Sequence, residues 1–172
     1  NQNMWKAYKK ANIDLTEYLK LKFVASNASF FIFISTTTVY ENITEELEVD
    51  ESCVCNPLSV YAKSKLEAEK ALIELSQLNG NSVAIYRLPG VFGKWCRPYY
   101  NSVVATFCYS KAFDFPIQID NPNSVLQLVH IDDVIRSFMS HLQKINFGLI
   151  RPSIFPTYSI SVGELSDQLE YY

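Results

Sequence analysis

Apolar and polar residues follow one another along this chain in blocks whose spacing changes between that of a helix and that of a strand. The continuous apolar run over residues 30–34 predicts a strand buried on both faces of a parallel sheet, and residues 83–88 predict a second strand. Apolar residues recur near the helical period over residues 4–23 and 59–78, which predicts two helices. Strands that alternate with helices in this way predict an α/β fold with a parallel sheet.

The second half of the chain continues the alternation with shorter elements. A helix is predicted over residues 101–113, and Asp132 can cap another helix that runs to about residue 143. Short strands are predicted over residues 117–119, 126–129 and 158–160, and a last helix over residues 163–169. Loops are predicted at the acidic stretch 41–50 and at Asn79-Gly80-Asn81.

Composition and charge are those of a soluble globular protein. The 172 residues are 48% hydrophobic and 19% charged, and the net charge is -3. Because the sequence has no run of Lys or Arg, nucleic acid and anionic membranes are not expected as partners. The longest apolar run is far shorter than the roughly 20 residues of a membrane span. The first ten residues hold no apolar export signal, so we expect a cytoplasmic protein.

The cysteines do not predict a metal site. Cys53, Cys55, Cys96 and Cys108 form no Cys-x-x-Cys pair, and the two histidines lie far from them in the sequence. Reduced thiols, as in cytosolic proteins, are the expected state.

Thr36 and the pair Tyr61 and Lys65 are the most informative candidates for chemistry. Thr36 follows the first predicted strand, and Lys65 lies one helical turn after Tyr61. A nearby ammonium favours phenolate and lowers the pKa of the tyrosine, which makes it a usable acid or base. Thr36 would then hydrogen-bond the same substrate oxygen; the alternative is a hydroxyl that satisfies the local backbone. Tyr18 and Lys22 share the spacing but follow no such hydroxyl.

The glycines do not form a dinucleotide-binding turn. The five glycines are Gly80, Gly90, Gly93, Gly148 and Gly163, and no Gly-x-x-Gly-x-x-Gly turn joins a strand to a helix. The segment Gly90-Val91-Phe92-Gly93 has a partial spacing, but it leads into Lys94 rather than into a helix, so we interpret it as a turn.

Five short sequence motifs follow one another along the chain: Asn12 to Thr16, Ser35 to Tyr40, Tyr61 to Lys65, Arg87 to Gly93, and His130 to Asp133. In this order they resemble the extended short-chain dehydrogenase/reductase family that acts on nucleotide sugars. The segment from Phe92 to Cys108 resembles, more narrowly, the reductases that make UDP-N-acetyl-6-deoxy-L-hexosamines for bacterial capsule and O-antigen.

The resemblance implies part of a Rossmann-like doubly wound parallel sheet and part of a small C-terminal substrate-binding region. Residues 1–93 would be the C-terminal portion of the nucleotide-binding domain, and residues 94–172 mostly the substrate-binding region, truncated at its end. What is absent corresponds to the family's first βαβ unit, which carries the glycine turn.

The resemblance also assigns roles. Thr36, Tyr61 and Lys65 would be catalytic, and Tyr61, Lys65, Leu88 and Pro89 would contact NADP or NAD. Substrate contacts are expected from Thr37, Thr38, Gly90, Lys94, Arg97 and Asn101. The last three precede a predicted helix, whose N-terminus suits a diphosphate; a solvated loop is the alternative. His130 is expected to be structural.

Some residues depart from the family pattern. Relatives carry an asparagine at Gly90, an arginine near Leu126 and a glycine at Glu41, which puts direct substrate contacts at the first two positions in doubt. Thr37 and Thr38 stand where dehydratases place Asp-Glu, and threonines cannot serve as that acid and base. A dehydratase is therefore disfavoured.

The expected function is NAD(P)H-dependent reduction of a UDP-linked 4-keto-6-deoxy-N-acetylhexosamine. A UDP-hexose 4-epimerase that uses the same residues is one alternative, and an incomplete, non-catalytic fragment or module is another. The expected partner is the UDP-sugar. A homodimer is left open, because apolar surface along residues 30–34 would favour association.

Overall fold

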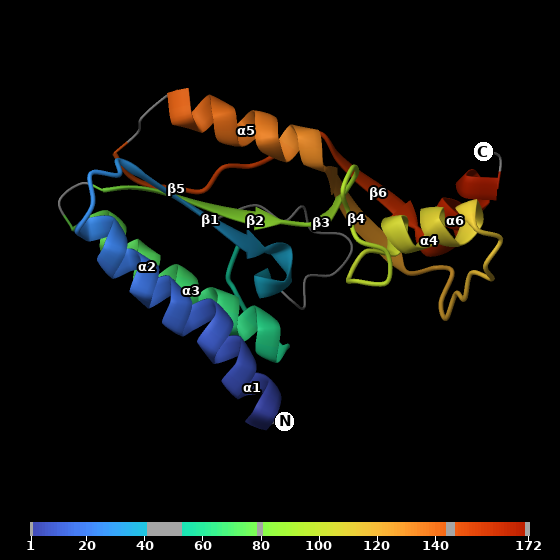
Figure 1. Ribbon diagram of the computed structural model, residues 1–172, viewed down its shortest axis with the longest axis horizontal. Coiled ribbons are helices and arrows are strands. Elements are labelled where there is room, and N and C mark those ends of the chain that lie inside the picture. The colour runs from blue at the N-terminus through green and yellow to red at the C-terminus, as the bar shows by residue number, and fades with distance from the viewer. Residues whose placement is uncertain (1, 41–52, 79–80, 144–146, 171–172) are drawn as a thin grey trace. The chain divides into compact units, whose positions relative to one another are not determined.

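The computed structural model describes residues 2–40, 53–78, 81–143 and 147–170 (Figure 1). The chain forms two compact units. Unit 1 consists of Asn1–Leu88 and Met139–Ser153, and unit 2 consists of Pro89–Phe138 and Ile154–Tyr172. The acidic loop over 41–50 and the Asn79-Gly80 part of the predicted helix stop lie outside the described residues.

Unit 1 is built on a parallel sheet, as the sequence predicts. The strands are β1 (Phe30–Thr36), β2 (Ser82–Leu88) and β5 (Gly148–Ile150), in the order β1-β2-β5. The register of β1 and β2 runs from Phe30 opposite Ser82 to Thr36 opposite Leu88. β2 is buried along most of its length because it lies in the middle, whereas β1 is half-buried at the edge of the described sheet. The expected burial of β1 on both faces is therefore wrong.

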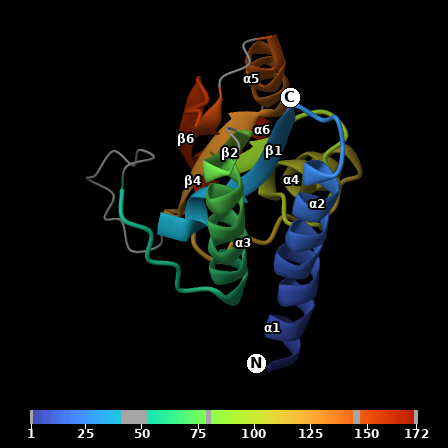
Figure 2. The same ribbon diagram turned by 90° about the vertical axis from the view of Figure 1, so that its left-hand side faces the viewer.

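Two helical segments lie side by side on one face of this sheet (Figures 1 and 2). The first contains α1 (Gln2–Tyr8), a π-helical stretch (Lys9–Asp14) and α2 (Leu15–Val24), so the single predicted helix has a π-helical middle. The second is α3 (Val60–Gln77), and the Ser59 side chain accepts a hydrogen bond of 3.1 Å from the Ala62 amide as its N-cap. The core between helices and sheet contains Phe23, Leu72, Leu75, Val83 and Ile85.

Unit 2 is a smaller mixed sheet with helices. Its strands are β3 (Gly90–Phe92), β4 (Val125–His130) and β6 (Thr157–Ser161), where β4 pairs parallel with β3 and antiparallel with β6. The helices are α4 (Val103–Ala112) and α6 (Val162–Glu170), and α5 (Ile131–Gln143) begins in this unit and ends in unit 1.

Three expectations for unit 2 are wrong. Gly90 to Phe92 form strand β3 instead of a turn, because their backbone pairs with β4. Residues 117–119 form no regular strand. Asp132 is not the cap of α5, since the helix already begins at Ile131.

The ring of His130 accepts a 3.2 Å hydrogen bond at Nδ1 from the Asp132 amide, in keeping with the structural role that the sequence predicts.

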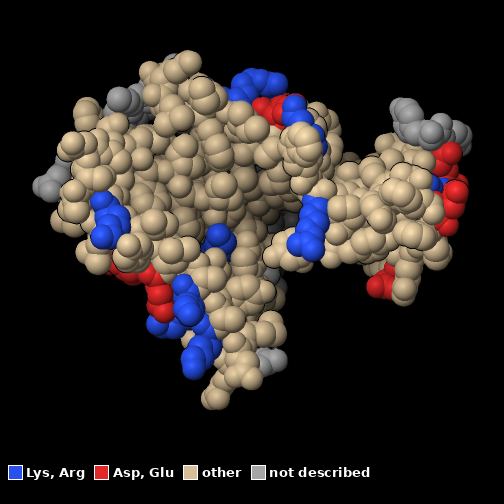
Figure 3. Space-filling view, viewed as in Figure 1, with Lys and Arg blue, Asp and Glu red and all other residues tan. Residues whose placement is uncertain are grey.

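Charged side chains are sparse on the face that Figure 3 shows. Basic side chains gather over the N-terminal helical segment, which contains Lys6, Lys9 and Lys10. Lys9 is paired there with Asp14 at 2.8 Å. Most of the remaining surface on this face is uncharged.

Candidate active site

The three candidate catalytic residues all belong to unit 1. Thr36 ends β1, and Tyr61 and Lys65 lie in the first two turns of α3. Residues four apart on a helix share a face, so Tyr61 and Lys65 point in a common direction. The Ser59 cap fixes the start of this helix just before the tyrosine. The sequence pattern thus places these residues on a strand end and on a helix that packs against that strand.

Lys65 is anchored to β1. Its Nζ donates a 2.9 Å hydrogen bond to the Ile34 carbonyl, two residues before Thr36. The same nitrogen lies 4.9 Å from the ring centroid of Phe33 and 6.0 Å from that of Tyr61. Burial lowers the pKa of the Lys65 ammonium, and the Glu69 carboxylate partly opposes this effect. The structure therefore brings Tyr61, Lys65 and the end of β1 together.

The environment of Tyr61 does not lower its pKa. Burial, and next the neighbouring Tyr8, raise the pKa of the Tyr61 phenol above its ordinary value. The two rings lie 5.6 Å apart, and Tyr61 keeps 37% of its surface exposed. The fall of the pKa that the sequence predicts is therefore not found in this structure, where burial has the largest effect on the phenol. Tyr61 is therefore protonated at neutral pH and suited to donate a proton.

Thr36 makes local hydrogen bonds. Its Oγ1 accepts from the Thr38 amide at 3.2 Å and shares a 3.0 Å hydrogen bond with the Thr38 hydroxyl. Thr37 and Thr38 belong to a 3₁₀ turn (Thr37–Tyr40) that follows β1 directly. The local backbone contact foreseen as the alternative for Thr36 is thus present, and the half-buried hydroxyl lies at the strand end.

The expected substrate and cofactor residues are divided evenly between the two units. Leu88 is the buried last residue of β2 in unit 1, whereas Pro89 begins unit 2. Gly90 lies in β3, where an added Cβ would meet the Gln127 carbonyl oxygen and Leu128 Cδ2 at 3.1 Å. Close packing on β4 therefore accounts for glycine at this position.

The three residues expected to bind a diphosphate precede α4. The Lys94 Nζ pairs with Asp132 at 3.1 Å, and the Arg97 guanidinium lies 5.4 Å from the ring centroid of Tyr100. Asn101 has a φ of 54° and is exposed immediately before the N-cap Ser102. All three side chains lie at the surface, where an anion could reach them.

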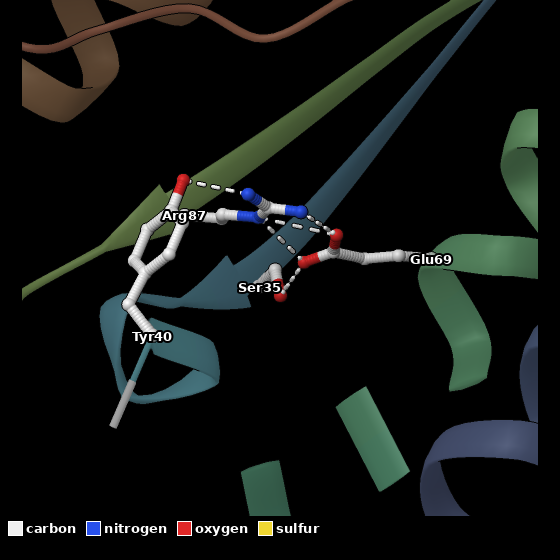
Figure 4. Close-up of polar contacts among 4 residues, drawn as sticks. All are labelled: Ser35, Tyr40, Glu69 and Arg87. Carbon is white, nitrogen blue, oxygen red and sulfur yellow. Dashed lines mark hydrogen bonds and ion pairs between the residues drawn. The ribbon is translucent and has the colours of Figure 1, made fainter. Parts of the chain in front are cut away.

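A buried polar network was missed in the sequence (Figure 4). The Glu69 carboxylate is fully buried and forms an ion pair with Arg87, whose Nη2 lies 2.6 Å from Oε2. Arg87 Nε also donates to both carboxylate oxygens, at 3.1 and 3.2 Å, and Nη1 donates to the Tyr40 hydroxyl at 2.6 Å. The Ser35 hydroxyl donates to Glu69 Oε1.

The hydrogen bonds of this network favour the charged form of Arg87. Burial opposes the charge on Arg87, but hydrogen bonds to Glu69 and Tyr40 outweigh it and raise the guanidinium pKa above its ordinary value. Two signals in the sequence could have indicated the network. Glu69 continues the helix face of Tyr61 and Lys65, and Arg87 interrupts an otherwise apolar strand.

Neither a metal cluster nor a membrane helix is found among the described residues. In the described ranges, no group of three or more His, Cys, Asp and Glu side chains could hold a metal ion. None of the helices that the structure describes is long and apolar enough to cross a membrane. The cysteines Cys53, Cys55, Cys96 and Cys108 form no disulfide bond.

The parallel sheet with helices, and the tyrosine and lysine next to a strand end, define a class of nucleotide-dependent enzymes. Residues 2–153 match the NAD dependent epimerase/dehydratase family, and the chain belongs to this family. The family expected from the sequence is confirmed.

Among curated proteins, the chain is 40% identical over 162 residues to the UDP-2-acetamido-2,6-beta-L-arabino-hexul-4-ose reductase of Pseudomonas aeruginosa. This match covers 94% of the chain and 40% of the reductase, so the chain spans well under half the length of that relative.

The chain is also similar to solved structures. The UDP-glucuronic acid 4-epimerase from Bacillus cereus, in complex with UDP-glucuronic acid and NAD, has a TM-score of 0.81 and 26% identity, over 93% of this chain and 50% of the epimerase. The capsular polysaccharide assembling protein CapF from Staphylococcus aureus has a TM-score of 0.74 and 27% identity, over 92% of this chain and 40% of CapF. These matches confirm the Rossmann-like α/β fold class.

Proposed function

We propose that the protein represented by this chain reduces the 4-keto group of a UDP-linked 4-keto-6-deoxy-N-acetylhexosamine with NADH or NADPH, in bacterial surface polysaccharide synthesis. The observation that supports the proposal is the 2.9 Å hydrogen bond from Lys65 to the Ile34 carbonyl, because Tyr61 lies one turn before Lys65 on α3 and Thr36 lies two residues after Ile34. The 40% identity to a UDP-linked hexulose reductase supports the substrate class.

Tyr61 supplies the proton. A tyrosine phenol is protonated at neutral pH, so Tyr61 can donate to the 4-oxygen of the sugar as a hydride reaches the 4-carbon. The carbonyl becomes an alcohol, and the phenol becomes a phenolate. The Lys65 ammonium, on the same helix face, stabilises this phenolate electrostatically. Thr36 donates a hydrogen bond to the same oxygen when its hydroxyl turns away from Thr38.

The residues present fit a nicotinamide cofactor, which supplies the hydride when it is bound. An ammonium has three N–H donors, and the bond to Ile34 uses one of them, so Lys65 can also hold ribose hydroxyl groups. Tyr61, Leu88 and Pro89 would contact the nicotinamide side. Thr37, Thr38 and Gly90 would contact the sugar, and Lys94, Arg97 and Asn101 the diphosphate of the substrate.

The test is an assay of the intact protein with a UDP-4-keto-6-deoxy-N-acetylhexosamine and reduced cofactor. We expect one nicotinamide to be oxidised for each sugar reduced, followed by the loss of nicotinamide absorbance and by product analysis. Sugar turnover without net cofactor oxidation would contradict the reductase proposal and support a 4-epimerase, the second candidate. The structural similarity to the Bacillus cereus epimerase favours that second candidate over unrelated activities.

The proposed substrate is a cytoplasmic metabolite class, so the proposal includes a cytoplasmic location. A homodimer also stays a prediction, and sedimentation of the intact protein checks it.

A further inference from the structure

The Glu69–Arg87 ion pair links the two elements that carry the candidate catalytic residues. Glu69 lies on α3, one helical turn after Lys65 and two turns after Tyr61. Its carboxylate accepts from the Ser35 hydroxyl, and Ser35 is the neighbour of Thr36 in β1. The hydrogen bond between Ser35 and Glu69 therefore joins β1, which carries Thr36, to α3, which carries Tyr61.

Arg87 connects this pair of elements to the turn after Thr36. In the parallel register, Arg87 lies opposite Ser35, so its side chain reaches the end of β1. Its Nη1 donates to the hydroxyl of Tyr40, the last residue of the 3₁₀ turn, at 2.6 Å, and the guanidinium lies 4.8 Å from the Tyr40 ring centroid. Figure 4 shows Arg87 between Tyr40 and Glu69.

The segment before α3 also contacts the turn after Thr36. The Asn56 amide donates a 3.0 Å hydrogen bond to the Val39 carbonyl. The segment that leads into α3 is thus joined to the turn that follows Thr36, and Arg87 contacts the last residue of that turn, Tyr40.

Stability alone is a weak explanation for the pair. Burying two charges is costly, and apolar residues of similar volume often replace a buried ion pair without loss of stability. The planar guanidinium, by contrast, fixes the directions of several hydrogen bonds at once. We propose that Arg87, held by Glu69, is a positioning residue that sets the distance between Thr36 and Tyr61 through Tyr40. This inference rests on the proposed function, because it assigns the distance a role in proton transfer.

The sharpest test is Tyr40→Phe in the intact protein, assayed for reduction of the UDP-4-keto sugar. The ring stays in the core while the acceptor for Arg87 Nη1 is removed. We expect kcat to fall by about tenfold to a hundredfold, because small displacements of reacting groups have effects of this size. KM and the cofactor Kd should stay unchanged, since no substrate contact is lost. Glu67→Gln is the matched control on the same helix, because Glu67 pairs with Lys70 at the surface, and it should change nothing.

A second variant distinguishes a role of the ion pair in positioning the catalytic residues from a contribution to protein stability. Glu69→Leu combined with Arg87→Met replaces the ion pair by apolar side chains, and we expect a folded protein whose kcat falls at least as far as in Tyr40→Phe. Wild-type kcat in either folded variant would overturn the inference, and so would a loss confined to KM.

Amide hydrogen exchange over Thr37–Tyr40 gives a readout that does not need activity. Exchange there should be faster in Tyr40→Phe than in the wild type, while β2 stays protected. Unchanged exchange would overturn the inference even if the wild type is not a reductase. A wild type without reductase activity, but with the expected exchange, would refute the proposed function and leave the turn-holding role supported.

Discussion

At the scale of single residues, burial shifts the pKa values of the two central groups in opposite directions. It raises the pKa of the Tyr61 phenol and lowers that of the Lys65 ammonium. Each shift favours the neutral form, as desolvation does. At neutral pH the phenol is protonated with or without this shift, so Tyr61 can donate the proton that the proposed reduction needs.

The first prediction is that Tyr61→Phe lowers kcat of the intact protein by about 10²- to 10⁴-fold, the range that general acid–base groups contribute. Cofactor binding should stay largely intact, since the ring remains. Steady-state kinetics and a cofactor titration measure the two effects. The control is Tyr18→Phe, because Tyr18 has the same spacing to Lys22 and is exposed away from a strand end. Full activity in Tyr61→Phe would remove the proposed proton donor.

The second prediction concerns alkaline pH. The folded-state pKa of Tyr61 is raised above 10.0, so the folded protein holds this proton after the unfolded chain has released it. Stability therefore falls as pH rises through the window that begins at the unfolded value. Urea unfolding should show the wild type losing stability relative to Tyr61→Phe above about pH 10, and no pH-dependent difference between pH 7 and 9. A difference that grows in the opposite direction would contradict the raised pKa.

At the scale of elements, periodicity and length decided what the sequence could predict. β1, β2 and the long helices were predicted because their apolar patterns extend over many residues. β3 and β5 are three residues each and carry no periodic signal, and β3 exists only through its pairing with β4. Local pattern likewise proposed a strand at 117–119, where the structure has none.

The residues of the candidate site were only partly predictable from the sequence. Tyr61 and Lys65 could be found because their spacing lies within one helix, and Thr36 because it ends an apolar strand. The Glu69–Arg87–Tyr40 contacts join a helix, a strand and a turn, so only the fold reveals them. The hydrogen bond from Lys65 to the Ile34 carbonyl is also a tertiary contact.

The third prediction concerns the turn that follows β3, where Gly93 lies close to His130 and to Ile131 at the start of α5. Gly93 has a φ of 120°, and an added Cβ would lie 2.7 Å from His130 Nε2 and 2.9 Å from Ile131 Cγ2. Gly93→Ala should lower the free energy of unfolding by about 1–3 kcal/mol through backbone strain, and further through this contact. Gly148→Ala is the matched control, because Gly148 has a φ of 88° with nothing within 4 Å of an added Cβ. Chemical denaturation measures both, and an equal loss in the two variants would exclude the His130 contact as a cause.

At the scale of the whole molecule, each of the two units contains part of the proposed site residues. Unit 1 holds Thr36, Tyr61 and Lys65, and unit 2 holds the surface residues Lys94, Arg97 and Asn101. Unit 1 also carries an apolar groove lined by α2 and β1, with Leu15, Leu19 and Ile34 at least 42% exposed. Exposed apolar surface of this kind favours association, as expected from residues 30–34.

The last prediction is that the 172-residue chain alone does not bind the cofactor tightly and is inactive. A dinucleotide diphosphate is normally held by backbone N–H groups of a glycine-rich turn at a helix N-terminus. Among the described glycines, Gly163 alone lies in the first turn of a helix, and its amide already donates to the Pro122 carbonyl at 2.9 Å. Gly90, Gly93 and Gly148 lie in or beside strands. Lys65 then offers ribose contacts without a site for the diphosphate. Calorimetric titration of the chain with NADH and NADPH should show no micromolar binding. Micromolar affinity for either would mean that these residues build a diphosphate site without a glycine turn, and would contradict the prediction.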